Sequence, residues 1–288
     1  YNQLVVNLTG VRKFDVGGLA SPLNVAVGAE ARREGYQLHA GEPDSWRNGG
    51  VILPSGVPAA SGAQVFPGFR PANASKRSRT AIGVFVDVEA NITDRLLASA
   101  AVREEHYNDF GSNLSGKLAG RFDFTKNFAL RGSVQNGFRA PSLQQQSFTS
   151  TSTNFVNGIP YEITTFTPND PVAVALGAKP LKAEKSTNFS LGAVVRLAPV
   201  SLTVDAYRIN VRDRIVLSEN LFSDAVHNYI VSQGFIGGGG GRFFINGVDT
   251  KTRGVDIVAS APWNAGAAGR FDFTLAGNFN RTEVTKVP

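Results

Sequence analysis

The sequence predicts an all-β protein whose antiparallel strands form a membrane-spanning barrel. Segments of about 10–14 residues alternate between apolar and polar side chains, the pattern of a strand with one apolar and one polar face. Their polar positions carry charges and small residues, as a water-filled interior allows. The connections between them alternate between short and long, with one exception, which places most of the loop residues at one end of the barrel.

The composition fits a barrel or a globular protein and excludes a disordered chain. Of the 288 residues, 42% are hydrophobic and 18% are charged, which is too apolar for disorder. No run approaches about 18 consecutive apolar residues, so the sequence predicts no transmembrane helix. Barrel strands remain possible, because they distribute their apolar residues in alternation.

Cysteine and methionine are both absent. Without cysteine the chain has no disulfide framework and no thiolate metal site. Because there is no initial methionine, we expect the chain to begin inside a longer gene product or after processing. The net charge is +6, but the basic residues are scattered, so we expect no nucleic-acid partner.

Two strands joined by a long connection stand at the centre of the pattern. Residues 128–138 and 188–197 both alternate strictly. Phe128, Leu130 and Val134 share the apolar face of the first strand. The connection, residues 139–184, is rich in Thr, Ser, Asn and Pro, and a loop of this length is usually functional.

Ten segments alternate in this way along the chain. We predict strands at residues 1–9, 22–33, 80–91, 95–108, 114–124, 128–138, 188–197, 201–214, 250–261 and 270–281. Within the eighth strand the apolar residues change face near Ala206, which predicts either a β-bulge or passage of the strand out of the bilayer.

The lengths of the connections separate the two ends of the predicted barrel. Every second connection is short, at residues 13–21, 92–94, 125–127, 198–200 and 262–269. Of the others, 37–78, 139–184 and 215–247 are long and 109–113 is short. Aromatic residues gather beside the short turns and predict an interfacial girdle, formed by Phe122, Phe124, Phe128, Trp263, Phe271 and Phe273.

A soluble β-sandwich or lipocalin-like barrel is the alternative, because alternation by itself does not say which face meets water. Three features favour the membrane barrel. The strands are longer than the usual five or six residues. The polar faces mix charges with small residues, and the long loops lie at one end.

Several stretches resemble TonB-dependent outer-membrane receptors. Four of them, in the family's order and spacing, are Gly137-Phe-Arg-Ala-Pro-Ser-Leu143, Leu181-Lys-Ala-Glu-Lys-Ser-Thr-Asn-Phe-Ser-Leu-Gly192, Val204-Asp-Ala-Tyr-Arg-Ile-Asn-Val-Arg-Asp-Arg-Ile215 and Thr252-Arg-Gly-Val-Asp-Ile257. Arg103-Glu-Glu-His-Tyr-Asn-Asp-Phe-Gly111 is also similar. The residues that carry the signature are Gly137, Phe138, Arg139, Ala140, Pro141, Glu184, Tyr207, Arg253 and Gly254.

The resemblance implies a barrel of 22 strands with short periplasmic turns and long extracellular loops. About ten strands are present, so we interpret residues 1–288 as a partial barrel domain without the plug domain and the C-terminal strands. A complete barrel of ten or twelve strands is the structural alternative. The chain departs from the family at Ala183, where Pro is usual, and at Ser190, where an acidic residue is usual. It shows no energy-coupling box, and it ends on Pro288 rather than on an aromatic residue.

Two groups of residues are candidates for contacts inside the barrel. The polar face of the strands predicts a lumen lining of Lys117, Arg121, Asp123, Arg131, Gln135, Arg196, Asp205, Asp272 and Asn278, which would contact plug or ligand. The long loops carry aromatic residues that could grip a ligand or pack within the loops: Trp46, Phe148, Phe155, Tyr161, Phe222, Tyr229 and Phe235.

Other chemistry has little support in the sequence. His39, His106 and His227 lack metal-ligand spacing, and no Gly-x-Ser-x-Gly elbow surrounds a serine. The Gly237–Gly241 run lacks the Lys-Ser/Thr ending of a phosphate loop, so we predict a flexible loop there. Asp87 and Glu89 share a face and are expected to be solvated lumen charges.

The resemblance implies a bacterial outer-membrane receptor that takes up a scarce nutrient with TonB-coupled energy. It would be no enzyme and would need no cofactor. Its partners would be outer-membrane lipid, a small-molecule ligand, its own plug and TonB. A siderophore-iron, cobalamin or carbohydrate ligand is equally open. The alternatives are a passive porin-like or small complete barrel and an outer-membrane hydrolase.

Overall fold

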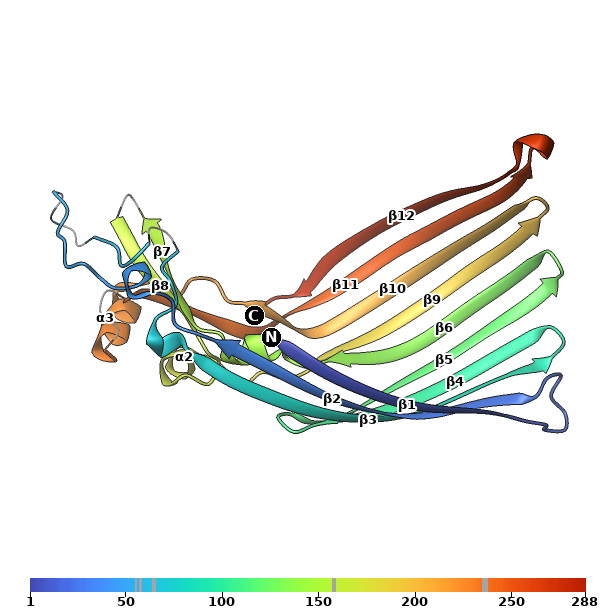
Figure 1. Cartoon of the computed structure of the whole chain (residues 1–288), viewed down its shortest axis with the longest axis horizontal. Coiled ribbons are helices and arrows are strands. Elements are labelled where there is room, and N and C mark those ends of the chain that lie inside the picture. The colour runs from blue at the N-terminus through green and yellow to red at the C-terminus, as the bar shows by residue number, and fades with distance from the viewer. Residues whose placement is uncertain (55, 57–58, 64–65, 157–158, 235–237) are drawn as a thin grey trace.

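The computed structural model describes all residues except 55, 57, 58, 64, 65, 157, 158 and 235–237. Of residues 155, 156, 159–161 and 238 it describes the backbone alone. The chain is all-β, as the sequence predicts, and its strands form one sheet of twelve strands. Figure 1 shows long strands running side by side from a region of loops at one end to a row of short turns at the other.

Ten long strands make the wall of this sheet. They are β1 (Asn2–Phe14), β2 (Leu23–Leu38), β3 (Ser75–Thr93), β4 (Leu96–Tyr107), β5 (Gly111–Thr125), β6 (Phe128–Arg139), β9 (Glu184–Leu197), β10 (Val200–Leu217), β11 (Gly238–Asn264) and β12 (Arg270–Lys286). Each pairs antiparallel with the next in this order. All ten strands predicted from the alternation are therefore present, in the predicted order.

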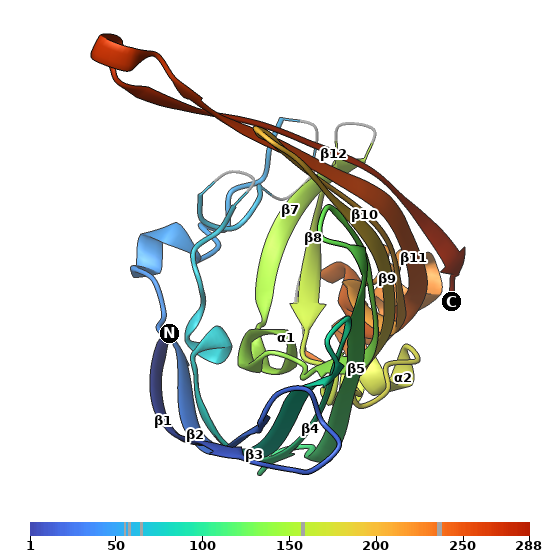
Figure 2. The ribbon, with the colours of Figure 1, turned by 90° about the vertical axis from the view of Figure 1, so that its right-hand side faces the viewer.

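The wall is curved rather than flat. Figure 2, which looks along the strands from the short turns, shows the ten long strands bent around one side of a central space. The strands β7 (Ser150–Val156) and β8 (Ile159–Phe166) lie on the concave side of that curve. β1 and β12 are the edges of the ten long strands, which form an open wall consistent with part of a barrel.

The loop end contains regular structure that the alternation did not predict. β7 and β8 form a hairpin, and β8 pairs parallel with the first residues of β11. The long connections also contain three α-helices, α1 (Leu143–Ser147), α2 (Pro171–Ala175) and α3 (Asp224–Ser232). They contain two 3-10 turns as well, η1 (Pro43–Ser45) and η2 (Pro71–Asn73). A third 3-10 turn, η3 (Gly266–Ala268), lies in the short connection before β12. A buried cluster joins these connections and consists of Phe166, Val172, Ala173, Ala178, Ile230 and Phe243.

One prediction about the loops is wrong. Gly238–Gly241 is not a flexible loop but the beginning of β11, paired with Glu162–Thr164 of β8. Gly237 lies outside the described residues. The cause is close packing, because a Cβ at Gly241 would come within 2.9 Å of the Phe166 ring. Glycine is therefore used here for the close approach of a neighbouring side chain and not for flexibility.

The change of face in β10 has a different cause from a bulge at Ala206. The register of β10 with β9 is continuous from Val200 to Arg212. The register with β11 shifts only after Val211, where Asp213 has a φ of 56°. The strand therefore keeps its alternation through Ala206 and leaves the apolar zone there, so that its next residue on the same face is Arg208.

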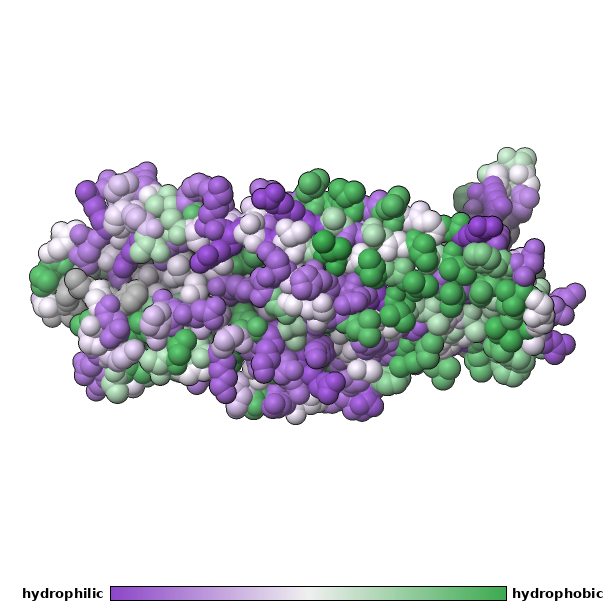
Figure 3. All heavy atoms as spheres, turned by 90° about the horizontal axis from the view of Figure 1, so that it is seen from below, coloured by the Kyte–Doolittle hydropathy of each residue, from purple (hydrophilic) through white to green (hydrophobic). Residues whose placement is uncertain are grey.

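An apolar band covers one face of the wall and is exposed in this chain. Leu8, Leu118 and Leu275 are 76%, 61% and 76% exposed. Figure 3 shows hydrophobic residues concentrated toward the short turns and hydrophilic residues further toward the loops. Around Phe124 the aromatic residues cluster near the turns, with ring centroids 4.7 and 5.5 Å from those of Phe122 and Phe128. Among the described residues, no helix has both the length and the apolar character needed to span a membrane.

Candidate functional site

All nine candidate lumen residues lie on one face of the sheet, opposite the apolar band. The cross-strand register places Arg121 beside Arg131, Arg131 beside Gly192, and Gly192 beside Asp205. The same row continues through Asp256 to Asn278. Lys117, Asp123, Gln135, Arg196 and Asp272 occupy neighbouring rows of this face. We call it the inner face, because it is the concave side that holds β7 and β8 (Figure 2).

A glycine lets two charges of this row meet across a strand. Arg131 Nε and Nη2 donate to the two Asp205 carboxylate oxygens at 2.8 and 2.5 Å, a bidentate pair. Gly192 stands between them on β9, and a Cβ there would lie 1.9 Å from Asp205 Oδ1. The far end of the row is also bonded, because Asn278 Nδ2 donates to Asp256 Oδ1 and to Tyr207 Oη.

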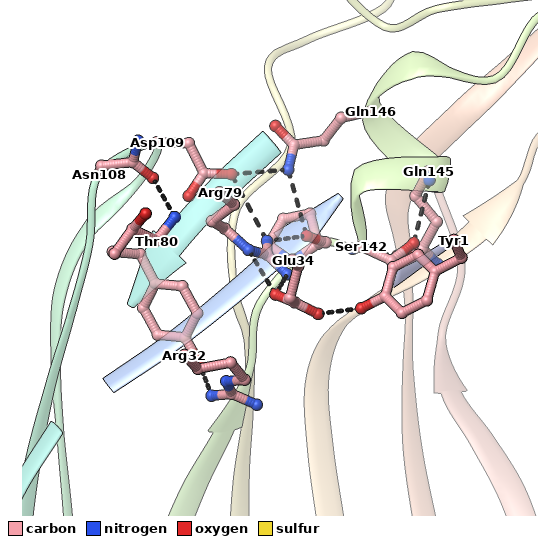
Figure 4. Close-up of polar contacts among 12 residues, drawn as sticks. Tyr1, Arg32, Glu34, Arg79, Thr80, Asn108, Asp109, Ser142, Gln145 and Gln146 are labelled. Carbon is pink, nitrogen blue, oxygen red and sulfur yellow. Dashed lines mark hydrogen bonds and ion pairs between the residues drawn. The ribbon is translucent and has the colours of Figure 1, made fainter. Parts of the chain in front are cut away.

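Further toward the loops, Arg79 is the centre of a buried network (Figure 4). Its side chain is 5% exposed. Nε and Nη2 donate to Glu34 Oε2 at 2.9 and 2.6 Å, and Nη1 donates to the Pro141 carbonyl at 2.7 Å. Asp109 Oδ2 lies 3.5 Å from Nη1, and Gln146 Nε2 donates to Asp109 and to the Pro141 carbonyl. The network therefore ties the strand wall to α1.

The Glu34 carboxylate stays ionised in this setting. Burial by itself would raise its pKa, but hydrogen bonds from Tyr1 Oη and Arg79, and the positive charges of Arg79 and Arg32, lower it overall. Glu34 lies on the loop side of Ala31, the last apolar-band residue of β2, and so outside the apolar zone.

A second cluster continues the network across β2, β3 and β4. Arg32 Nη2 donates to Tyr107 Oη at 2.9 Å, and Tyr107 Oη donates to Glu105 Oε2 at 2.7 Å. Arg103 pairs with Glu105 at 2.5 Å and with Glu30 at 3.2 Å. Burial and the neighbouring Glu105 raise the pKa of Tyr107 to about 12, so its hydroxyl remains a donor.

Two cavities lie on either side of the Arg79 network. One, of about 570 Å³, is lined by Arg32, Glu34, Arg79, Glu105, Tyr107 and the signature segment Gly137–Ala140. The other, of about 900 Å³, lies among the loops and is lined by Arg70, Arg77, Asp109, Gln146, Thr151 and Asp170, among others. Arg70 Nη2 pairs with Glu162 Oε2 at 2.9 Å at its edge. The loop cavity is large enough for a small-molecule ligand.

The signature residues contact one another in the structure. Arg139 Nε and Nη2 donate to the Glu184 carboxylate at 2.9 and 2.5 Å, and the Ile215 N–H donates to Glu184 Oε1 at 2.7 Å. Tyr207 lies opposite Gly254, where a Cβ would meet its ring at 2.4 Å. The Arg139–Glu184 pair joins the two ends of the 139–184 connection, and the Tyr207–Gly254 contact lies in the β10–β11 ladder. Arg253, by contrast, lies on the opposite face, that of the apolar band.

The loop aromatics do not converge on one place. Phe148 packs edge-on against Phe69, with ring centroids 6.1 Å apart, and Tyr229 packs on the buried cluster. Trp46 Nε1 donates to the Gly41 carbonyl at 3.1 Å, and Phe222 is 44% exposed. The side chains of Phe155 and Tyr161, and all of Phe235, lie outside the described residues. A ligand role for this group stays a prediction.

Sequence reasoning missed a polar cluster on the inner face. The residues it missed are a connected group of five charged side chains and one tyrosine, buried or partly buried: Arg32, Glu34, Arg79, Arg103, Glu105 and Tyr107. The sequence did contain a pattern that could have revealed them. Glu30, Arg32 and Glu34 occupy every second position of one strand, and Arg103, Glu105 and Tyr107 do the same in another. Asp87 and Glu89 share the inner face as expected. Among the described residues, no three His, Cys, Asp or Glu side chains form a metal-ligating cluster.

Comparison with known proteins agrees with this geometry. No curated protein matches the chain. Among solved structures it is similar to a variant of the ferric enterobactin receptor of Pseudomonas aeruginosa with enterobactin bound, at a TM-score of 0.64 and 15% identity, covering 96% of this chain and 36% of that one. The siderophore receptor PirA of Acinetobacter baumannii is similar at 0.61 and 16%, covering 99% and 36%. The RagAB peptide transporter is similar at 0.62 and 16%, covering 99% and 30%.

These likenesses show the fold, and the chain spans about a third of the length of the proteins just named. The family model described as "TonB dependent receptor-like, beta-barrel" matches residues 7–287, nearly the whole chain. The chain belongs to the TonB-dependent receptor-like β-barrel family.

Proposed function

We propose that this chain is the wall and loop segment of a bacterial outer-membrane receptor that takes up a scarce nutrient with TonB-coupled energy. The observation that carries the proposal is the loop cavity of about 900 Å³, whose lining includes Asp109 and Gln146 of the Arg79 network. A ligand captured among the loops would leave this cavity toward the lumen past Arg79 and α1.

The folded loops favour a receptor over a passive pore. β7, β8 and α1 lie on the concave side of the wall at the loop end, where an open channel would need free space (Figures 1 and 2). Arg79 ties α1 to the wall through Pro141 and Gln146. A porin-like wall gains nothing from a buried network that holds its loops inward, whereas a receptor needs loops that enclose its ligand.

The chemistry of the loop cavity supports an anionic metal chelate as the ligand. Of its charged lining residues, Arg70 pairs with Glu162, Asp109 contacts Arg79 and Asp170 accepts the Val172 N–H. Arg77 makes no ion pair among the described residues, and it can meet an anion while the hydroxyls of Thr149, Thr151 and Thr164 bond oxygen-rich groups. The named relatives include siderophore receptors, one of them with enterobactin bound. We therefore propose the siderophore-iron class ahead of cobalamin and carbohydrates.

The inner face would contact a plug domain. Arg121, Arg131 and Asp205 present charges toward the concave side. Two rows further toward the loops lie Lys117 and Gln135, whose side chains make no hydrogen bond or ion pair among the described residues. A plug domain could move along polar rows of this kind without breaking or forming contacts between apolar side chains. In this family role the protein binds and transports and performs no catalysis.

The proposal is tested in iron-limited cells that carry the full-length protein as their one receptor of this type. We expect the protein in the outer-membrane fraction and uptake of a radiolabelled ferric siderophore that stops when TonB is deleted. Uptake that continues without TonB would support a passive pore and contradict the proposal. A panel with catecholate and hydroxamate chelates, cobalamin and oligosaccharides identifies the ligand class.

Single substitutions at two neighbouring basic residues test the loop cavity itself. Arg77 lines the cavity, whereas Lys76 precedes it on the opposite face of β3. Arg77→Gln is expected to weaken binding of an anionic chelate by about tenfold, because one charge-assisted contact is lost. Lys76→Gln, the matched control, leaves binding unchanged. Equal effects of the two changes would remove the cavity from the proposal.

A further inference from the structure

Arginines form a cross-strand row on the apolar-band face of the wall. Arg208 of β10 lies directly opposite Arg253 of β11, and Arg253 lies directly opposite Arg281 of β12. These three residues, the basic row, point away from the inner face, because their neighbours Tyr207, Gly254 and Asn280 belong to it. The side chain of Arg281 is 82% exposed.

On β10–β12 the basic row begins where the apolar band ends, whereas on β9 Phe189, directly opposite Arg208, still belongs to the band. One row nearer the short turns, the same face carries Leu191, Ala206, Val255 and Phe279. Phe279 is 70% exposed. One row corresponds to two residues, or roughly 7 Å along a strand. The guanidinium groups therefore lie at the depth where the acyl chains of a bilayer end and its headgroups begin.

The row places like charges beside one another, which destabilises a sheet unless something compensates. Lys185 and Arg212 are also direct neighbours, two rows further toward the loops, and Lys251 lies in the row between. With the basic row they form the basic patch. Glu283 is its one internal acid and pairs with Arg281 at 3.2 Å. Asp249, at the border of the patch nearest the loops, accepts the Asp213 N–H.

Most side chains of the patch have no partner among the described residues. Arg208 Nε donates to Asn210 Oδ1 at 3.0 Å. Within the described part of the chain, the side chains of Arg253, Lys185 and Arg212 make no hydrogen bond or ion pair. At the same border β2 carries the single cation Arg33, and the corresponding residues of β3, β4 and β6 are Thr80, Glu104, His106 and Asn136, so directly adjacent positive charges belong to β9–β12.

We propose that the basic patch binds the phosphate groups of the phosphorylated glycolipid that forms the outer leaflet of the bacterial outer membrane. Arginine forks bind phosphate oxygens in pairs, and a phosphate between neighbouring arginines removes their mutual repulsion. The acyl chains of the same lipid would cover Val255, Phe279 and the apolar band below. The inference rests on the proposed outer-membrane location, because that leaflet is where such a headgroup meets the loop side of the wall.

The test uses the purified full-length protein in detergent, with diphosphorylated lipid A and the same lipid after removal of its phosphates as probes. The variant Arg208→Gln/Arg253→Gln/Arg281→Gln removes the row. The control Arg12→Gln/Arg33→Gln/Lys76→Gln removes three cations from the same face of β1–β3, where they are not adjacent. Bound lipid is counted by native mass spectrometry and its affinity by titration.

We expect the unchanged protein and the control to bind the diphosphorylated lipid at least about tenfold more tightly than the dephosphorylated one. The row variant should lose this preference, and a triple Arg→Lys variant should keep most of it. In the unchanged protein the preference should also weaken as salt rises. A row variant that keeps the preference, or a protein that binds both lipids equally, would overturn the inference.

Assembly is checked by heat modifiability on a denaturing gel. If the triple variant does not assemble, the single variant Arg253→Gln tests the inference instead, because this side chain has no partner in the described chain. Its loss should still weaken phosphate-dependent lipid binding severalfold. Membrane fractionation is a separate readout. A protein found outside the outer membrane refutes the proposed function, whereas an assembled outer-membrane protein without phosphate preference refutes this inference alone.

Discussion

At the scale of the residue, Gly192 shows how a missing side chain can create an ion pair. The Arg131–Asp205 pair spans β9, and a Cβ at Gly192 would lie 1.9 Å from Asp205 Oδ1. Gly192→Ala should push the carboxylate aside and cost at most about 1 kcal/mol, because the pair is partly exposed. The temperature at which heat modifiability is lost measures the change. In Gly120→Ala, the control, the new Cβ has ordinary contacts, so an equal loss would contradict the explanation.

Glu34 and Arg79 make a pH prediction at the same scale. The pKa of Glu34 is lowered in the folded protein, so the pair stabilises the fold above the ordinary glutamate pKa. This stability is lost as the pH falls through the lowered folded value. We expect the midpoint of thermal unfolding to be flat from about pH 8 to 5 and to fall below about pH 4.

The variant Glu34→Gln separates this pair from the other carboxylates. It should cost about 3 kcal/mol at neutral pH, because Arg79 keeps a buried charge with less compensation. It should also make the unfolding midpoint less sensitive to acid. If the acid dependence of Glu34→Gln equals that of the unchanged protein, other carboxylates control it.

At the scale of the element, β12 has two faces with opposite environments. Leu275 is 76% exposed on the apolar band, whereas Thr274 shares the inner face with Asn278. Leu275→Arg should cost roughly 2–4 kcal/mol and impair assembly, while Thr274→Arg should assemble normally. Fluorescent labels at both positions check the assignment. Lipid-soluble quenchers should reach the label at 275 and water-soluble quenchers the label at 274, and equal aqueous access would contradict it.

The connection between β2 and β3 is the element that reports orientation. Gly50 lies in it with open space around its Cα, so an inserted epitope tag should not disturb the wall. In intact cells carrying the full-length protein, antibody should reach a tag after Gly50. A tag in the short turn at Gly18 should be reached only after the outer membrane is broken. The reverse result would invert the topology.

At the scale of the whole molecule, the unpaired edges of β1 and β12 determine whether residues 1–288 can be stable in a membrane by themselves. Among the described residues, β1 pairs only with β2 and β12 only with β11, so each has an edge of unpaired backbone groups. Such edges are prohibitive in lipid. Residues 1–288 expressed alone should aggregate without a heat-modifiable band. A compact, heat-modifiable monomer in detergent would show that the edges can close on each other.

The sequence by itself determined the ten long strands, their order and the face on which each side chain lies. This information is local, because a period of two follows from the extended backbone and persists in any register. The shared face of the nine candidate lumen residues, and the opposite face of Leu275, could therefore be predicted from alternation. The resemblance of the signature stretches identified the family through the same local order.

Only the tertiary structure decided which residues meet. Arg131 reaches Asp205, 74 positions away, because two registers and Gly192 bring them into one row. The basic row depends in the same way on the pairing of β10, β11 and β12. The loops were beyond prediction because β8 pairs with Gly238–Phe243, and Phe166 packs with Ile230 in one buried cluster. Such long-range contacts leave no period in the sequence, since they are fixed by register and packing between segments far apart along the chain.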